Sequence, residues 1–104
     1  MTLRKGSIHC KSIIGGLLYN TETAKEITGY VNYNGDGFKI FKTKNGNYFI
    51  AKMESAIVVD NMLNIISDFA YTNIKPISEH EYKRLLGRYN PDKYIELFGE
   101  VEEA

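Results

Sequence analysis

FKIFKTKNGNYFIAKM, residues 38–53, carries the strongest local structural signal in the chain, because two alternating runs flank Asn45-Gly46. This dipeptide is typical of the two-residue type I′ turn, in which both central residues need a positive φ angle. The sequence therefore predicts a β-hairpin with Asn45 and Gly46 as its loop, so that Thr43 lies opposite Tyr48.

The predicted register also assigns the side chains of the hairpin to two faces, because alternate residues of a strand point in opposite directions. We expect the core side to hold Phe38, Ile40, Lys42, Phe49, Ala51 and Met53. The opposite face mixes aromatic and lysine side chains and holds Lys39, Phe41, Tyr48, Ile50 and Lys52. Three interpretations of this contact face stay open: nucleic-acid binding by stacking and phosphate pairing, protein binding, and burial under a helix with the lysines at its rim.

Four helices are predicted from capping residues and from apolar side chains that recur at helical spacing. Ser78 and Glu81 form a capping box before the third helix, and Asn90-Pro91 provides an N-cap and a first-turn proline for the fourth. The predicted helices span residues 21–28, 60–70, 78–89 and 91–98.

These elements predict a small α+β domain over residues 16–104, with an antiparallel sheet of three or four strands centred on the hairpin and helices on one face. Pro76 has no N–H group, so residues 72–77 are expected at a sheet edge. Residues 54–59 fit either a strand or the start of a helix. Residues 1–15 are basic and lack periodicity, which predicts a flexible N-terminal arm.

The composition is that of one soluble globular domain of 104 residues, with 43% hydrophobic and 25% charged residues. No apolar run approaches the roughly 18 residues that cross a membrane. Cys10 is the only cysteine, which excludes an internal disulfide. We therefore expect a cytoplasmic protein with no membrane contact.

No motif in the chain indicates catalysis, a metal or a cofactor. His9 and Cys10 are neighbouring soft ligands, but zinc needs four ligands and the other histidine is the distant His80. A nucleophilic thiol needs a base beside it. Gly15-Gly16 is not followed by the Lys-Ser/Thr pair of a phosphate loop. The sequence predicts a protein that is not an enzyme and holds no cofactor.

The charge is balanced overall but divided along the chain. Residues 1–53 hold eight basic and three acidic residues, whereas residues 54–104 hold five basic and ten acidic residues. The acidic half predicts a partner-binding patch near the C-terminus, made of Asp92, Glu96, Glu100, Glu102 and Glu103. Such a patch can occupy a basic nucleic-acid channel on another protein, and an ordinary solvated surface is the alternative interpretation.

Three segments share a pattern with a known group of proteins: LLYNTETAKEI (17–27), KTKNGNYFIAK (42–52) and PISEHEYKRLLGRYNPDKYIELFGEVEEA (76–104). They resemble the small uncharacterised proteins carried by phages and conjugative elements of low-GC Gram-positive bacteria. The resemblance implies a phage or mobile-element accessory protein that acts by binding. Such proteins often counter host defence as anti-CRISPR or anti-restriction inhibitors.

The leading hypothesis is therefore an anti-CRISPR-like inhibitor of a host-defence nuclease, whose protein partner is a CRISPR or restriction effector. The alternative is a small nucleic-acid-binding regulatory module that uses the hairpin contact face. Either a monomer or a homodimer is compatible with an exposed hairpin edge.

Overall fold

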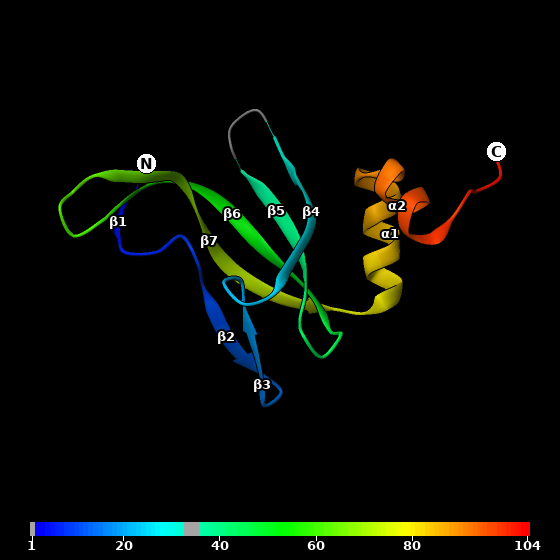
Figure 1. The fold of residues 1–104 in the computed structure, drawn as a ribbon, viewed down its shortest axis with the longest axis horizontal. Coiled ribbons are helices and arrows are strands. Elements are labelled where there is room, and N and C mark those ends of the chain that lie inside the picture. The colour runs from blue at the N-terminus through cyan, green and yellow to red at the C-terminus, as the bar shows by residue number, and fades with distance from the viewer. Residues whose placement is uncertain (1, 33–35) are drawn as a thin grey trace.

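The computed structural model describes residues 2–32 and 36–104, and over these residues it contains seven strands and two helices (Figure 1). The predicted α+β class is therefore confirmed, although most of the regular structure is sheet. The strands are β1 (Thr2–Lys5), β2 (Lys11–Ile14), β3 (Leu17–Asn20), β4 (Lys25–Val31), β5 (Gly37–Lys42), β6 (Tyr48–Val59) and β7 (Ile65–Ile77), and the helices are α1 (Glu79–Tyr89) and α2 (Pro91–Phe98).

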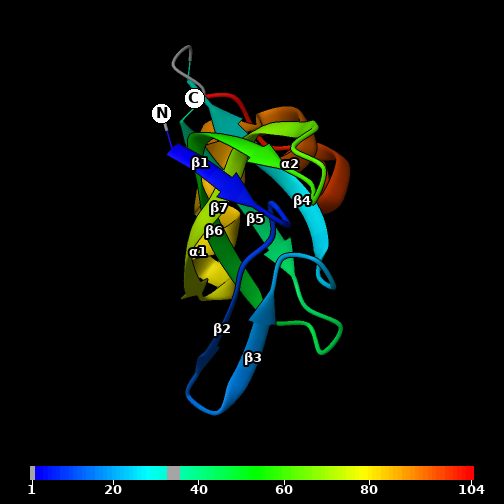
Figure 2. The same cartoon turned by 90° about the vertical axis from the view of Figure 1, so that its left-hand side faces the viewer.

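β6 is the centre of a five-stranded sheet. β7 pairs with one edge of β6, β5 and then β1 pair with the other edge, and β4 lies outside β5. Only β1 runs parallel to its neighbour among the described strands. β2 and β3 form a separate hairpin that projects from this sheet (Figure 2). The predicted sheet of three or four antiparallel strands is thus too small, and residues 54–59 belong to a strand.

The predicted helix over residues 21–28 is wrong. Residues 25–31 form β4, which pairs with β5 along its length. Gly29 lies so close to β5 that a Cβ atom on it would sit 2.5 Å from the carbonyl oxygen of Phe38. Pairing with a neighbouring strand here outweighs the local helical preference.

The predicted helix over residues 60–70 is also wrong. Instead of starting a helix, Asp60 closes a turn, in which its Oδ1 accepts the N–H groups of Met62 and Asn64 at 2.8 and 2.9 Å. The chain then returns along β6 as β7. Because Pro76 lies in β7, and β7 pairs only with β6 among the described strands of the sheet, the prediction of an edge strand is confirmed.

The other two predicted helices are confirmed, together with their caps. The hydroxyl of Ser78 accepts the N–H of Glu81 at 3.1 Å at the start of α1. The side chain of Asn90 accepts the N–H of Lys93 at 3.1 Å, and Pro91 begins α2. These caps satisfy N–H groups that every helix start leaves without an intrahelical partner.

The hairpin of β5 and β6 is confirmed, but its predicted register is wrong by one residue. Thr43 donates its N–H to the carbonyl oxygen of Asn47 at 2.8 Å. Gly46 has a positive φ angle of 87°, and Asn45 does not have a positive φ angle. The loop therefore has three residues, as in a type I turn followed by a glycine bulge. A slip of one residue moves side chains to the opposite face, so the predicted faces change.

Buried side chains lie on both faces of the sheet. One cluster packs against residues of the 8–24 segment and contains Tyr19, Phe41, Phe49, Ala51, Met53 and Tyr71. The other lies under α1 and contains Ile40, Tyr82 and Leu86. There the ring of Tyr82 stacks on that of Tyr48, with centroids 3.9 Å apart. The sheet is thus a middle layer, with the helices on one face as expected.

The first residues of the chain, expected to form a flexible arm, contribute β1 and β2. The guanidinium of Arg4 donates one hydrogen bond to the carbonyl oxygen of His9 at 2.9 Å and another to that of Tyr71 at 3.2 Å. Arg4 therefore joins the N-terminal segment to β7. The flexibility of residues 1–15 stays a prediction, because strand pairing in one structure does not measure motion.

Candidate binding sites

The five residues of the predicted hairpin contact face do not share one face. Phe41 is buried against Phe49, with their stacked rings 5.0 Å apart, and Lys39 on the same side pairs with Glu26. The opposite, helix-covered side carries Tyr48, Ile50 and Lys52. The five residues therefore do not form the single contact face that the type I′ register predicts, because the longer turn shifts β5 against β6 by one residue.

A surface groove of about 480 Å³ lies between the sheet and the C-terminal end of α1. Tyr30, Phe38 and Lys52 form a row across β4, β5 and β6, because Tyr30 pairs with Phe38 and Phe38 pairs with Lys52. Directly opposed residues point to the same face of a sheet. Tyr89 contributes from α1. The remaining lining residues are Asn32, Asp36, Gly37, Ile50, Asn73 and Lys75. We call this site the aromatic groove.

Three aromatic rings meet in the aromatic groove. The ring of Tyr89 lies 5.1 Å from that of Tyr30 and 5.2 Å from that of Phe38, and the latter pair is edge-to-face at 81°. Such geometry is favourable for aromatic pairs. Tyr30 and Tyr89 nevertheless stay 45% and 36% exposed. The guanidinium of Arg88 lies 5.4 Å from the centre of the Tyr89 ring. The groove thus presents accessible ring surface beside a cation.

The charges around the aromatic groove favour an anionic group. Lys52 and Lys75 line it from β6 and β7, while Asp36 lines it near the start of β5. The ammonium of Lys52 lies 3.1 Å from the carboxylate of Glu54, and both side chains are exposed. The described lining itself holds two lysines and one carboxylate. Beside it, Arg88 lies at the ring of Tyr89, and Glu81 on α1 interacts electrostatically with Lys75.

The aromatic groove was not predictable from the local sequence pattern. Phe38 was expected on the core side of the hairpin, Tyr89 ends the predicted helix 78–89, and Tyr30 lies between the predicted helix 21–28 and the hairpin. The cross-strand pairing of Tyr30 with Phe38 is the missing signal, and it becomes visible only when residues 25–31 are recognised as a strand. Ile50 and Lys52 are the two members of the predicted contact face that do line the groove.

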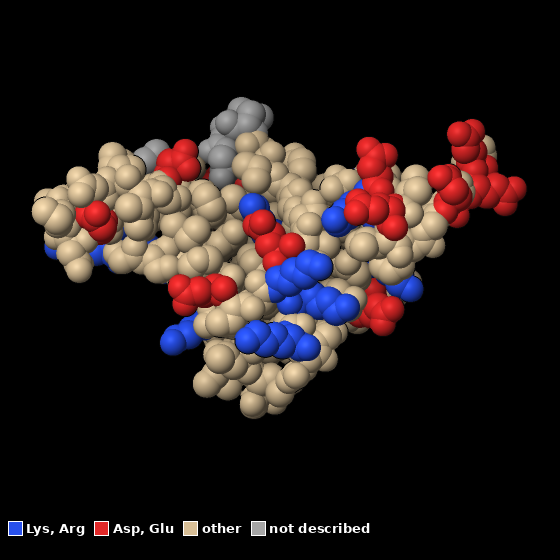
Figure 3. Space-filling model, in the orientation of Figure 1, with Lys and Arg blue, Asp and Glu red and all other residues tan. Residues whose placement is uncertain are grey.

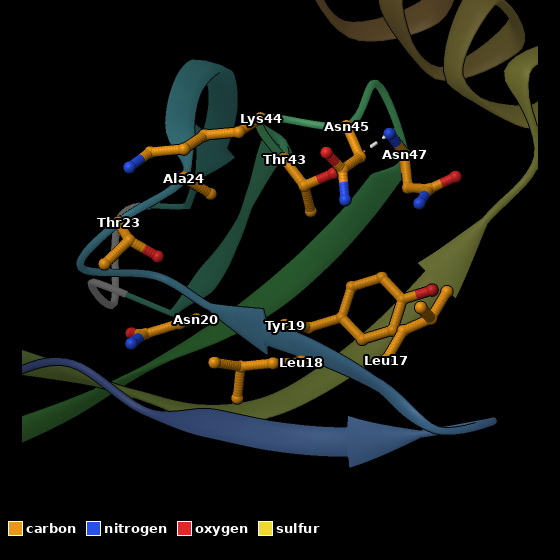
Figure 4. Close-up of a pocket in the computed structure, with 10 residues that line it drawn as sticks. All are labelled: Leu17, Leu18, Tyr19, Asn20, Thr23, Ala24, Thr43, Lys44, Asn45 and Asn47. Atoms are coloured by element: carbon orange, nitrogen blue, oxygen red, sulfur yellow. Dashed lines mark hydrogen bonds between the residues drawn. The ribbon is translucent and has the colours of Figure 1, made fainter.

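A second pocket, of about 230 Å³, lies between β3, the turn that follows it and the β5–β6 turn (Figure 4). Its lining residues are Leu17, Leu18, Tyr19, Asn20, Thr23, Ala24, Thr43, Lys44, Asn45 and Asn47. The described lining contains no carboxylate and no imidazole, which are the usual general bases. We therefore assign no chemistry to this pocket.

The polar residues around Cys10 form a hydrogen-bonded structural cluster. The hydroxyl of the buried Thr21 accepts the N–H of Cys10 at 3.1 Å and lies 3.0 Å from Nδ1 of His9. Burial raises the pKa of the Cys10 thiol, so the thiol stays protonated and weakly nucleophilic near neutral pH.

Tyr71 also has a shifted pKa. Burial, followed by the charge of Glu26, raises the pKa of Tyr71 to about 12.

The predicted acidic patch lies at one extremity of the elongated molecule, on α2 and the residues after it. Figure 3 shows acidic side chains gathered at this end, apart from a group of basic side chains in the middle of the view. The molecule measures 52 × 35 × 16 Å, and its long axis is horizontal in that view. All five predicted members are exposed: Asp92, Glu96, Glu100, Glu102 and Glu103. We call this surface the acidic end.

Within the described part of the chain, neither helix has the length and apolar character needed to cross a membrane. The same residues contain no group of three or more His, Cys, Asp or Glu side chains placed to hold a metal ion. In comparisons with known proteins, no family model, curated protein or solved structure matches this chain.

Proposed function

We propose that this protein is an accessory protein of a phage or mobile element that inhibits a host-defence nuclease by binding to it. The resemblance of three sequence segments to small proteins of such elements supports the setting. The observation that carries the mode of action is the acidic end, where five exposed carboxylates lie at one extremity of the molecule.

A nuclease must hold the phosphate backbone of its substrate with lysine and arginine side chains. The acidic end is complementary in charge to such a surface. Asp92 and Glu96 are carried by α2, whereas Glu100, Glu102 and Glu103 lie on the chain that follows Gly99. Charge complementarity of this kind accelerates association and makes it sensitive to salt. Occupation of the substrate channel would block the nuclease without any chemical step.

The test begins with tagged protein expressed in a low-GC Gram-positive host that carries active CRISPR and restriction systems. The expected result is stoichiometric recovery of one identified effector nuclease, together with inhibition of that nuclease by the purified protein. Recovery of no nuclease, or of a nuclease whose cleavage rate is unchanged, would contradict the proposal.

The role of the acidic end is tested separately with the variant Glu100→Gln, Glu102→Gln, Glu103→Gln. Inhibition should weaken at least tenfold, as expected when several charge pairs are lost. The matched control removes the same charge from exposed positions elsewhere, with Glu22→Gln, Asp68→Asn, Glu79→Gln. Equal inhibition by both variants would mean that the acidic end is not the contact surface.

A further inference from the structure

We infer that the aromatic groove binds single-stranded nucleic acid, with bases stacked on Tyr30 and Tyr89 and the backbone phosphates held by Lys52 and Lys75. This inference is independent of the acidic end, which lies on α2 and the C-terminal residues. The groove is a different surface from the predicted hairpin contact face, of which only Ile50 and Lys52 line the groove.

The size and shape of the groove suit a nucleotide unit. Its volume of about 480 Å³ lies within the range of small-ligand sites. Phe38 forms the floor between the two tyrosines, and Ile50 extends the apolar surface along β6. An apolar, ring-lined floor accepts the flat face of any base, which makes such recognition tolerant of sequence.

The tyrosines remain available for stacking. Tyr30 and Tyr89 contact each other at 43° between their ring planes, so they do not cover each other face to face. Almost half of Tyr30 is exposed, in a chain that buries Tyr71 and Tyr82 almost completely. A base that stacks on these rings removes further apolar surface from water without a change in the fold.

The position of the charges favours a phosphate beside the rings rather than a neutral ligand. Lys75 is placed next to Ile50 by the β6–β7 register, and Lys52 lies one pair further along β6 on the same face. The opposing carboxylates are Asp36 and Glu54, and Glu81 interacts electrostatically with Lys75 from α1. These carboxylates reduce the attraction, so binding should be weak, with the modest salt dependence of two lysine–phosphate contacts.

A duplex does not fit this site as well as a single strand. Paired bases are already stacked on one another, and their faces are inaccessible to protein rings. The groove therefore discriminates by strandedness. A free nucleotide has the same base and phosphate, but it engages the groove with one unit and lacks the flanking phosphates that reach Lys52 and Lys75 together.

The test is fluorescence anisotropy with a short labelled oligothymidylate, compared with a duplex of equal length and with unlabelled thymidine monophosphate as competitor. Single-stranded binding should weaken as salt rises from about 50 to about 200 mM, with duplex and mononucleotide at least tenfold weaker. No single-stranded binding at the lower salt, equal binding of duplex, or a mononucleotide that competes as well as the oligonucleotide would each overturn the inference.

Variants locate the site. The double variant Tyr30→Ala, Tyr89→Ala should lose about tenfold or more in affinity, whereas the double variant Tyr30→Phe, Tyr89→Phe keeps the rings and should keep the affinity.

The double variant Lys52→Gln, Lys75→Gln should lower the slope of log affinity against log salt by about 1.4, since each single-strand phosphate contact contributes about 0.7. The matched control is Lys25→Gln, Lys44→Gln, which removes two exposed lysines outside the groove. An unchanged affinity in the alanine variant, or an equal change of slope in the control, would refute the assignment.

The Glu100→Gln, Glu102→Gln, Glu103→Gln variant should still bind the oligonucleotide, which separates this inference from the proposed function.

Discussion

Leu63 occupies in the β6–β7 turn the position that Gly46 occupies in the β5–β6 turn. Both turns are closed by the same hydrogen bonds, because Thr43 donates its N–H to Asn47 at 2.8 Å and Asp60 donates its N–H to Asn64 at 3.0 Å. The fourth residue of each has a positive φ angle, 87° for Gly46 and 64° for Leu63. Leu63 is thus a branched residue held in a backbone conformation that glycine adopts without strain.

This relationship predicts that Leu63→Gly stabilises the protein. The left-handed conformation costs a side-chain-bearing residue roughly 1–2 kcal/mol, and Leu63 is 62% exposed, so little apolar contact is lost. We expect the free energy of unfolding in urea to rise by about 0.5–1 kcal/mol. The gain is smaller than the strain that is removed, because glycine has greater conformational freedom in the unfolded chain. The reciprocal change Gly46→Ala should lower it by about 1 kcal/mol. A loss of stability in Leu63→Gly would mean that the leucine side chain makes a stabilising contact.

The docking of α1 on the sheet predicts a large effect at Leu86. Its side chain is fully buried, at 0% exposure, in the cluster with Ile40 and Tyr82. Leu86→Ala leaves a cavity and should lower the free energy of unfolding by about 3 kcal/mol. Leu97→Ala on α2 removes the same atoms from a residue that is 46% exposed and should cost about 1 kcal/mol or less. Chemical denaturation of both variants measures the contrast, and equal losses of stability would contradict the burial of Leu86 between α1 and the sheet.

Tyr71 predicts a loss of stability at alkaline pH. Burial first, and then the charge of Glu26, raises its pKa to about 12, compared with about 10 in an unfolded chain. The unfolded chain therefore releases this proton first, so the stabilisation is complete below about pH 10 and is lost progressively between about pH 10 and about pH 12. Denaturation measured across this range should show a loss of about 2 kcal/mol that the variant Tyr71→Phe does not show. Glu26→Gln should reduce the loss without abolishing it. Identical pH profiles for the wild type and Tyr71→Phe would exclude Tyr71 as the cause.

Arg4 predicts the behaviour of the N-terminal segment. Its guanidinium bridges the carbonyl oxygens of His9 and Tyr71, and charge-assisted hydrogen bonds of this kind are worth roughly 1.5–3 kcal/mol. In Arg4→Met, amide hydrogen exchange should accelerate over residues 2–14 and stay unchanged in the central part of β6. The control is Lys5→Met, which removes an exposed charge one residue away. Exchange that is already rapid over residues 2–14 in the wild type would support the predicted flexible arm and show that Arg4 does not hold it.

The features that were correctly predicted depend on contacts within a few residues. Ser78 and Asn90 accept N–H groups three residues ahead, and Pro91 occupies the first turn of α2. The same holds for the existence of the β5–β6 hairpin. The charge of the acidic end was also predictable, because its members follow closely along the chain and need no partner strand to bring them together.

The features that were missed depend on pairing between distant segments. Capping residues and apolar spacing favour helices over residues 21–28 and 60–70, but residues 25–31 and 65–70 form strands because β5 and β6 satisfy their backbone hydrogen bonds. The aromatic groove is of the same kind, since Tyr30, Phe38 and Tyr89 come from β4, β5 and α1.

Local sequence was therefore sufficient for α1 and α2 with their caps, for the existence of the β5–β6 hairpin and for the acidic end, because short-range hydrogen bonds and chain order specify them. The register of the hairpin, the five-stranded sheet and the groove needed the folded chain. A loop of three residues, one more than predicted, shifts β5 against β6 by one position and changes which of their side chains share a face. This register buries Phe41 and Phe49 under residues 8–24 and Ile40 under α1, and that packing decides the length of the loop.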